Sequence, residues 1–284
     1  MVGQRRPKPS AQPVVGRRRI HSSSGSCPWH SSVRPTAEDV PVTGTPACTP
    51  LFDEEPPPRE TYILDHGFRF NPDTWRRRLP DGIDLPAWFG DLPRAGRWPR
   101  ITRGDLLRGG AAADTGRLAV DVLIGAYAWG HGLPARRGPA RLRQVFDRNI
   151  GRVEQHLGET VRLLRSGGPF AAYEGLNHGG DHNLRRLGAS FFTKLLYFLG
   201  WDSAAGNHRP LIMDQYVVIG LNAFRNTAWK PLGPWTADQY GEYLSWAQET
   251  ARGWGAGTET DVVERALWEY GRCLAERRRR RPLT

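Results

Sequence analysis

A lone lysine inside an apolar stretch most limits what this chain can fold into. Lys194 stands in the run FFTKLLYFL, residues 191–199, which is otherwise broken only by Thr193. At helical spacing its neighbours offer no polar face of a helix to the ammonium group. The group must therefore reach solvent, pair with an acid or serve a chemical function. Burial lowers the pKa of lysines in general, and proteins use such lysines as nucleophiles in Schiff-base chemistry.

An acidic counterpart follows twenty residues later (214 minus 194), at Asp214. It comes directly after the apolar triplet Leu-Ile-Met and before a second apolar run, residues 215–221. An aspartate at the start of a periodic apolar run, with Pro210 upstream, predicts the N-cap of a new helix. The connection 200–210 is rich in Gly, Ser, Asn and Pro and is long enough to let the second helix lie beside the first. We therefore expect both side chains to face one cavity.

The stretch around this pair resembles the helix-hairpin-helix DNA glycosylase superfamily, and within it the 8-oxoguanine DNA glycosylase branch. The shared pattern is a lysine that opens a buried helix, a connection of similar length, and a hydrophobic triplet followed by aspartate. Thr193-Lys194 and Leu-Ile-Met-Asp214 correspond to this pattern. The close resemblance covers residues 187–217, and a looser one, as a helical chain, covers residues 60–275.

The hairpin departs from the family pattern in two places. Glycines usually stand two and four residues before the lysine, but Phe192 and Ser190 occupy these positions and the nearest glycine is Gly188. A histidine is common two residues after the aspartate, where this chain has Tyr216. The hairpin therefore lacks the small residues with which the family's hairpin meets phosphate.

The resemblance implies a bifunctional DNA glycosylase and AP lyase that removes an oxidised purine, 8-oxoguanine. Such an enzyme extrudes the nucleotide from the duplex to reach the N-glycosidic bond. Lys194 would attack C1′ and form an imine, which permits β-elimination of the 3′ phosphate. Asp214 would stabilise the positive charge that develops on the sugar. The resemblance implies no cofactor and no metal.

Further site residues are predicted around the pair. Aromatic faces suit a flipped purine, so we assign Tyr197, Phe198, Gln215 and Tyr216 to the substrate pocket. Packing in the core is an equally good interpretation of the first two. The residues predicted to contact the DNA backbone are Arg185, Arg186, Ser190, Arg209 and Arg225.

Charge favours a nucleic-acid partner. The chain of 284 residues has a formal net charge of +11 and an isoelectric point near 10.2. Such a positive charge favours a nucleic-acid partner over an anionic membrane, since no long apolar span or basic amphipathic helix stands out. An arginine-rich composition gives the same charge to proteins that bind no DNA. Together with the resemblance, it predicts a monomer whose partner is double-stranded DNA with a damaged base, and no membrane contact.

The cysteines exclude two classes of protein. The three cysteines lie far apart, at positions 27, 48 and 273, and form no CxxC pair. No disulfide framework is implied, so we expect a cytoplasmic, nucleoid-associated protein. The four closely spaced thiolates of an iron–sulfur cluster are also absent from the sequence, which leaves the cluster-free branch of the superfamily.

Three parts follow from composition and periodicity. Residues 1–58 are rich in Pro, Ser and Arg without an apolar period, and we predict a disordered tail. Residues 59–276 should form an all-α, two-lobed helix-hairpin-helix glycosylase-like domain, with irregular structure and short helical turns up to residue 103. Residues 277–284 should form a basic tail. A short helix is expected to start at Thr102 or Asp105. Further helices are expected near residues 116–130, 139–166 (divided at Gly151 and Gly158 into two or three pieces), 170–176, 191–199, 214–225, 236–252 and 258–276.

Two other classes of function remain open. The first is a non-catalytic helical protein that binds nucleic acid through its basic ends. The second is a metal-dependent hydrolase centred on His178, Asp181 and His182, although the glycines around them also explain the segment as a turn. Borohydride trapping separates the three classes, since only the lysine mechanism gives a covalent adduct with DNA.

Overall fold

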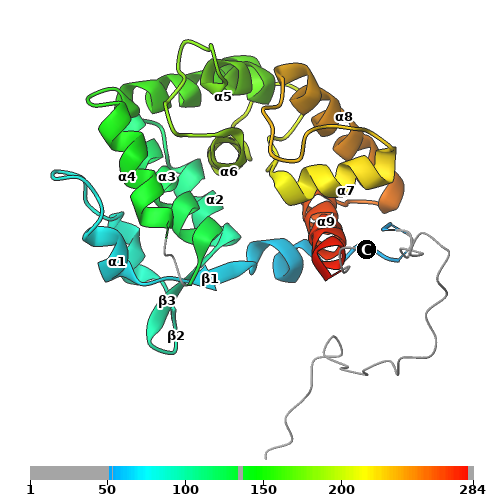
Figure 1. Cartoon of the computed structure of the whole chain (residues 1–284), viewed down its shortest axis with the longest axis horizontal. Helices are drawn as coiled ribbons and strands as arrows, with labels where there is room; N and C mark the ends of the chain where they lie inside the picture. Colours follow the sequence, from blue (N-terminus) through cyan, green and yellow to red (C-terminus); the bar gives the residue numbers. More distant parts are fainter. Residues whose placement is uncertain (1–50, 53, 134–136, 281–284) are drawn as a thin grey trace, which may run out of the picture. The chain divides into compact units, whose positions relative to one another are not determined.

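The predicted helical domain is confirmed by the computed structural model, which describes residues 51–52, 54–133 and 137–280 (Figure 1). The predicted disordered tail lies outside the described residues, except for its last few positions. These described residues belong to one compact unit. Among the helices described, none combines the length and the apolar character needed to cross a membrane.

The segment predicted to be irregular contains a small sheet. Strands β1 (Gly67–Arg69) and β2 (Arg94–Ala95) both pair antiparallel with β3 (Trp98–Thr102), in the order β1-β3-β2. Three short helical segments surround it: η1 (Glu60–Leu64), α1 (Pro72–Arg76) and η2 (Ala87–Asp91). The strands are short and Pro99 interrupts β3, so no alternating pattern marks them in the sequence.

The first group of helices comprises α2 (Arg103–Ala111), α3 (Gly116–His131), α4 (Gly138–Arg148), α5 (Val153–Leu176) and α6 (Ala189–Gly200). Thr102 caps α2 in a reciprocal capping box with Asp105, and Thr115 caps α3. The predicted stretch 139–166 divides between α4 and α5 near Gly151, as expected, but α5 continues through a kink at Gly168 and Pro169 into the predicted helix 170–176.

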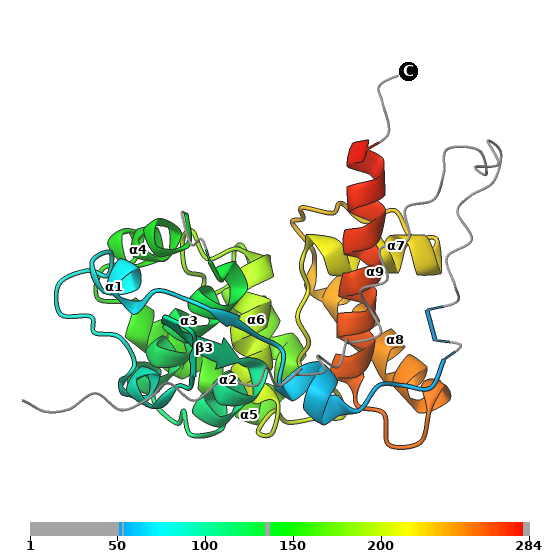
Figure 2. The ribbon, with the colours of Figure 1, turned by 90° about the horizontal axis from the view of Figure 1, so that it is seen from below.

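The second group comprises α7 (Gln215–Arg225), α8 (Ala237–Trp254) and α9 (Thr260–Arg280), with α9 crossing α7 (Figure 2). Glycine makes this crossing possible. A Cβ on Gly271 would lie 1.9 Å from the Tyr216 carbonyl oxygen, and one on Gly220 would lie 2.4 Å from that of Leu267. The two helix backbones are thus in direct contact, which fixes the start of α7 against α9.

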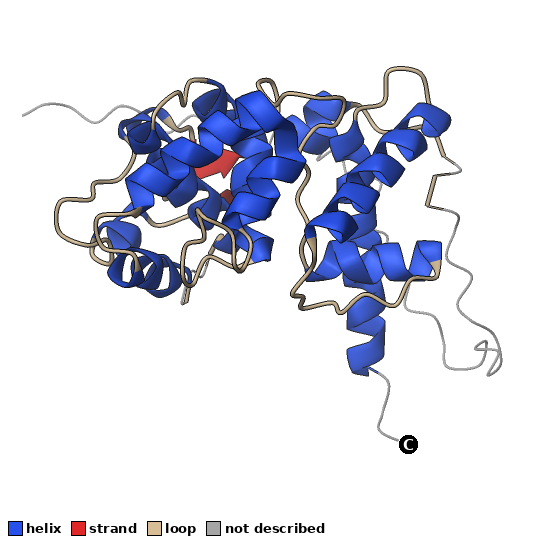
Figure 3. Cartoon of the chain, turned by 90° about the horizontal axis from the view of Figure 1, so that it is seen from above, coloured by secondary structure: helices blue, strands red, loops and turns tan. Residues whose placement is uncertain are grey.

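Helix α6 is the buried centre of the first group. It packs against α2, α3 and α5 (Figure 1), in a body that is made mostly of helices (Figure 3). Every residue from Phe192 to Gly200 is buried, as the apolar run predicts. An apolar helix covered on all sides places Lys194 inside the protein.

The helical body begins earlier than predicted, because the end of the assigned tail packs on it. The Phe52 ring lies 4.8 Å from the Trp254 ring and 5.2 Å from the Phe224 ring, measured between centroids. The Trp254 indole donates a 2.6 Å hydrogen bond to the Glu54 carbonyl. At the other end, α9 continues to Arg280, so the described part of the predicted basic tail is helical.

Candidate active site

A threonine hydroxyl aligns the two central residues. Thr193 Oγ1 accepts a hydrogen bond from the Met213 N–H at 3.1 Å and lies 3.1 Å from the Met213 carbonyl oxygen. The residue before Lys194 thereby holds the residue before Asp214. Because Thr193 is fully buried, these bonds compete with little water.

Lys194 and Asp214 meet as the sequence predicts. The Lys194 Nζ lies 3.0 Å from Asp214 Oδ2 and donates a second hydrogen bond, of 2.9 Å, to the Ser190 carbonyl. Asp214 Oδ1 caps α7 by accepting from the N–H groups of Tyr216 (3.0 Å) and Val217 (3.3 Å). The side chains are only 8% and 16% exposed. An amine and a carboxylate are therefore held together in a largely dry site, each in a fixed direction.

The pair lines a cavity of about 520 Å³, large enough for a nucleobase. Its walls are mainly aromatic. The rings that line it are those of His66, Phe68, Trp129, His131, Phe191, Tyr216 and Trp268. They come from the sheet and from α3, α6, α7 and α9, so both groups of helices contribute to it.

A buried ion pair also lines this cavity. Arg103 Nη1 and Glu264 Oε2 are 2.5 Å apart, and the two side chains are 2% and 0% exposed. Burial alone would lower the pKa of Arg103, but the carboxylate of Glu264 outweighs it and raises that pKa. The guanidinium also lies over the Trp129 ring, 5.1 Å from its centroid. Its Nε has no hydrogen-bond partner among the described residues.

Two histidines in the cavity have lowered pKa values. Burial, followed by the charge of Arg103, lowers the pKa of His66 to about 2. Burial also lowers the pKa of His131, and the charges of Arg141 and Lys194 act in the same direction. The sequence analysis missed both residues, since nothing local connects them with Lys194.

The predicted substrate residues divide into two pairs. Gln215 and Tyr216 line the cavity. Tyr197 and Phe198 lie in the core instead, at 0% and 1% exposure. The Tyr197 hydroxyl donates a 2.9 Å hydrogen bond to Asp261, and the buried environment raises the pKa of this tyrosine. Their positions on α6 face neighbouring helices, so the assignment of these two to the base pocket is corrected.

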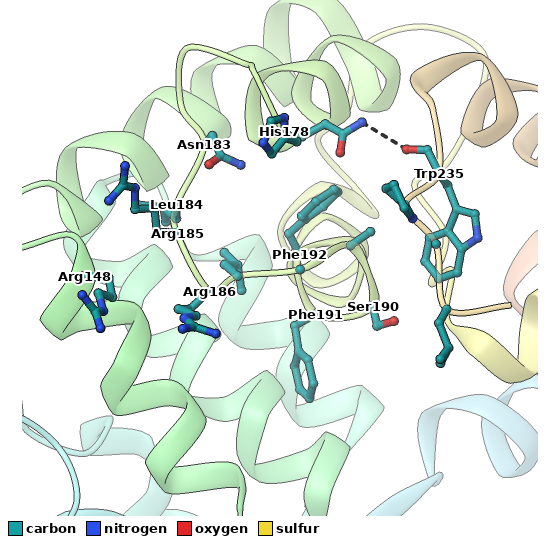
Figure 4. A pocket seen from close by; sticks show the side chains of 17 residues that line it. Arg148, His178, Asn183, Leu184, Arg185, Arg186, Ser190, Phe191, Phe192 and Trp235 are labelled. Carbon is teal, nitrogen blue, oxygen red and sulfur yellow. Dashed lines mark hydrogen bonds between the residues drawn. The ribbon is translucent and has the colours of Figure 1, made fainter. Parts of the chain in front are cut away.

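Two of the predicted DNA-contacting arginines lie together beside a second cavity, of about 860 Å³. Arg185 and Arg186 project from the connection before α6, and Arg148, which the sequence analysis missed, joins them from the end of α4 (Figure 4). Ser190 lines both cavities. A basic surface therefore adjoins the cavity that holds the lysine.

The other two arginines lie elsewhere and have local partners. Arg225 pairs with Glu242 at 2.7 Å. Arg209 lies over the Trp201 ring, 5.3 Å from its centroid, and donates a hydrogen bond to the Trp201 backbone carbonyl. Neither lines the two cavities described above.

The metal-site alternative finds no support in the geometry. Across residues 51–52, 54–133 and 137–280, no three His, Cys, Asp or Glu side chains are grouped so that they could hold a metal ion. His182 instead packs edge-on against His156, with ring centroids 5.8 Å apart. His178 lines the second cavity. The segment is a turn, as its glycines suggest.

Comparison with known families gives one match. The family model described as "Putative 8-oxoguanine DNA glycosylase OGG-like protein" matches residues 61–268. No match was found among curated proteins or among solved structures. The matched range extends from η1 into α9 and contains Lys194, Asp214 and every residue that lines their cavity.

Proposed function

The chain belongs to the family of OGG-like 8-oxoguanine DNA glycosylases, and from this premise we propose that it excises 8-oxoguanine from double-stranded DNA and cleaves the strand through a Schiff base. The observation that carries the proposal is the contact between Lys194 and Asp214, at 3.0 Å, in a cavity of nucleobase size. A buried amine beside a carboxylate matches what this chemistry requires.

Lys194 supplies the nucleophile. Its neutral amine attacks C1′ of the extruded nucleotide while the bond to the base breaks and the base leaves with the electron pair. Loss of the amine proton and opening of the sugar then give an imine to Nζ. Asp214 can accept a proton from the ammonium group across the 3.0 Å contact and stabilises the positive charge that develops on the sugar.

The aromatic walls support binding of a flat heterocycle. Trp129 and His66 meet edge to face, with centroids 5.3 Å apart, and Tyr216 and Trp268 do so at 5.9 Å. Such walls exclude water and favour a base that has left the stack. The buried Arg103–Glu264 pair adds fixed polar groups to the lining.

The arginines beside the second cavity support binding of the DNA backbone. Arg148, Arg185 and Arg186 are exposed. In the part of the chain that the structure describes, none of the three forms an ion pair with an acidic side chain. Free guanidinium groups bind phosphate oxygens well. These arginines line the second cavity together with Ser190, which also lines the cavity that would receive the base.

Excision on matched duplexes tests the proposal. The wild-type chain should release the base from a duplex with one 8-oxoguanine and leave the same duplex with guanine intact. Asp214→Asn keeps the side-chain shape and an oxygen to cap α7, but it removes the charge. We expect base release to fall by orders of magnitude while folding is nearly unchanged. A wild-type protein that binds the damaged duplex without releasing the base would contradict the proposed function.

A further inference from the structure

The last turn of α3 packs against the lysine side chain. A Cβ built on Gly130 would lie 3.7 Å from both Cδ and Cε of Lys194. The next residue, His131, lines the same cavity as Lys194 and is half-buried. An imidazole is thus located where α3 meets the reactive amine.

Hydrogen bonding fixes the tautomer of this imidazole. His131 Nδ1 lies 3.0 Å from the Tyr127 carbonyl oxygen. A carbonyl can only accept, so Nδ1 carries the proton and the neutral ring has its lone pair on Nε2. The ring also stacks on Phe191, with centroids 5.0 Å apart and planes at 13°. Its orientation is therefore held by two independent contacts.

The carboxylates of the cavity are engaged. Asp214 uses both carboxylate oxygens, one for Lys194 and one for the cap of α7. Glu264 binds the Arg103 guanidinium through both of its oxygens. The Nδ1 of His66 has no partner among the described residues, but it is buried and the nearby charge of Arg103 opposes the gain of a proton there. Among the described residues that line the cavity, His131 is left with an unengaged basic nitrogen.

We propose that His131 is the general base of the β-elimination that follows Schiff-base formation, an inference that rests on the proposed function. Its Nε2 takes a proton from C2′ of the imine. The electron pair of that C–H bond becomes the C2′=C3′ double bond, and the C3′–O bond breaks. The phosphate leaves with the electron pair of the broken bond, and His131 becomes an imidazolium. The strand is then nicked with no further reactant.

The proposal separates the two activities of the site. Base release and imine formation need Lys194 and Asp214, whereas nicking also needs His131. His131→Phe keeps a ring that can stack on Phe191 but has no basic nitrogen. General bases contribute about 10²–10⁴-fold to rates. We therefore expect nicking to slow by about 100-fold or more relative to base release and borohydride trapping, which use Lys194 and Asp214.

The experiment uses the full chain and a duplex with one 8-oxoguanine. Base release, trapped adduct and strand nicks are measured on the same samples, and nicks are counted before and after hot alkali. His131→Phe should accumulate sites that only alkali converts to nicks. The matched control is His156→Phe, because His156 has a buried Nδ1 without a partner in the described structure and lines neither cavity. This control should nick at the wild-type rate.

A second variant distinguishes loss of the base from misfolding. In His131→Ala, added imidazole should restore nicking in proportion to its concentration, which a purely structural role would not produce. Nicking by His131→Phe at the wild-type rate would overturn the proposal, as would an equal loss of base release and nicking in both variants. A wild-type chain that neither releases base nor forms an adduct would instead contradict the proposed function, and the inference with it.

Discussion

Removing one partner of the Arg103–Glu264 pair should destabilise the protein strongly. The two charged groups are 2.5 Å apart and almost fully buried, at 2% and 0% exposure. Two unit charges about 4 Å apart between their centres attract by about 4 kcal/mol at an effective dielectric constant near 20. A single partner left behind loses that attraction while it stays desolvated. Arg103→Met and Glu264→Leu should each lower the free energy of unfolding by about 3–5 kcal/mol.

The double variant provides the decisive comparison. Arg103→Met with Glu264→Leu removes both charges and fills the space with apolar groups, so its free energy of unfolding should lie within about 2 kcal/mol of wild type. Urea-induced unfolding at neutral pH measures all four proteins. Single variants that cost less than about 1 kcal/mol, or a double variant that costs their sum, would refute the claim that the two buried charges compensate each other.

Four further predictions follow from other contacts. Thr193→Val removes the acceptor of the Met213 N–H, so unfolding should become about 1–3 kcal/mol easier and base release slower; unchanged release would show that the hydroxyl does not align the site. The folded-state pKa of His66 lies below its ordinary value, so the stability that His66 contributes is complete above pH 6.5 and is lost as the pH falls. Between pH 7 and 5.5, the free energy of unfolding should fall by about 1 kcal/mol more in the wild type than in His66→Phe. Parallel curves of unfolding free energy against pH for the two proteins would contradict this. Phe52→Ala should cost about 1–2 kcal/mol, whereas a chain starting at residue 51 should melt like the full chain. Replacing Arg148 and Arg185 by alanine should weaken binding to damaged and undamaged DNA equally. The slope of the logarithm of the binding constant against the logarithm of salt concentration should become shallower by about 2. A changed base preference would instead assign the two arginines to recognition of the damaged base.

The local part of the site could be predicted because it depends on sequence order. Lys194 and Asp214 lie on consecutive helices joined by a short connection, so their meeting follows from spacing and capping alone. The chain has only three lysines, Lys8, Lys194 and Lys230, and one of them in an apolar run is a strong signal. The N-cap at Asp214 and the buried helix around Lys194 are confirmed for the same reason.

The rest of the site depends on contacts distant in sequence. Arg103 and Glu264 are 161 positions apart, and no local pattern links them. The placement of Tyr197 and Phe198 was wrong because a helix that is apolar on every side has no hydrophobic period from which to choose a face. The strands of the small sheet are too short to show alternation. Burial of this kind is determined only when the helices pack.

Borohydride trapping with lysine variants tests the central claim most directly. The wild-type chain, incubated with a duplex that contains one 8-oxoguanine, should give a covalent protein–DNA adduct. Lys194→Gln should give none while it still binds the duplex. Lys230→Gln is the matched control, because Lys230 is exposed and belongs to a loop, and it should trap like wild type. A Lys194→Gln protein that still forms the adduct would place the nucleophile elsewhere and contradict this account of the site.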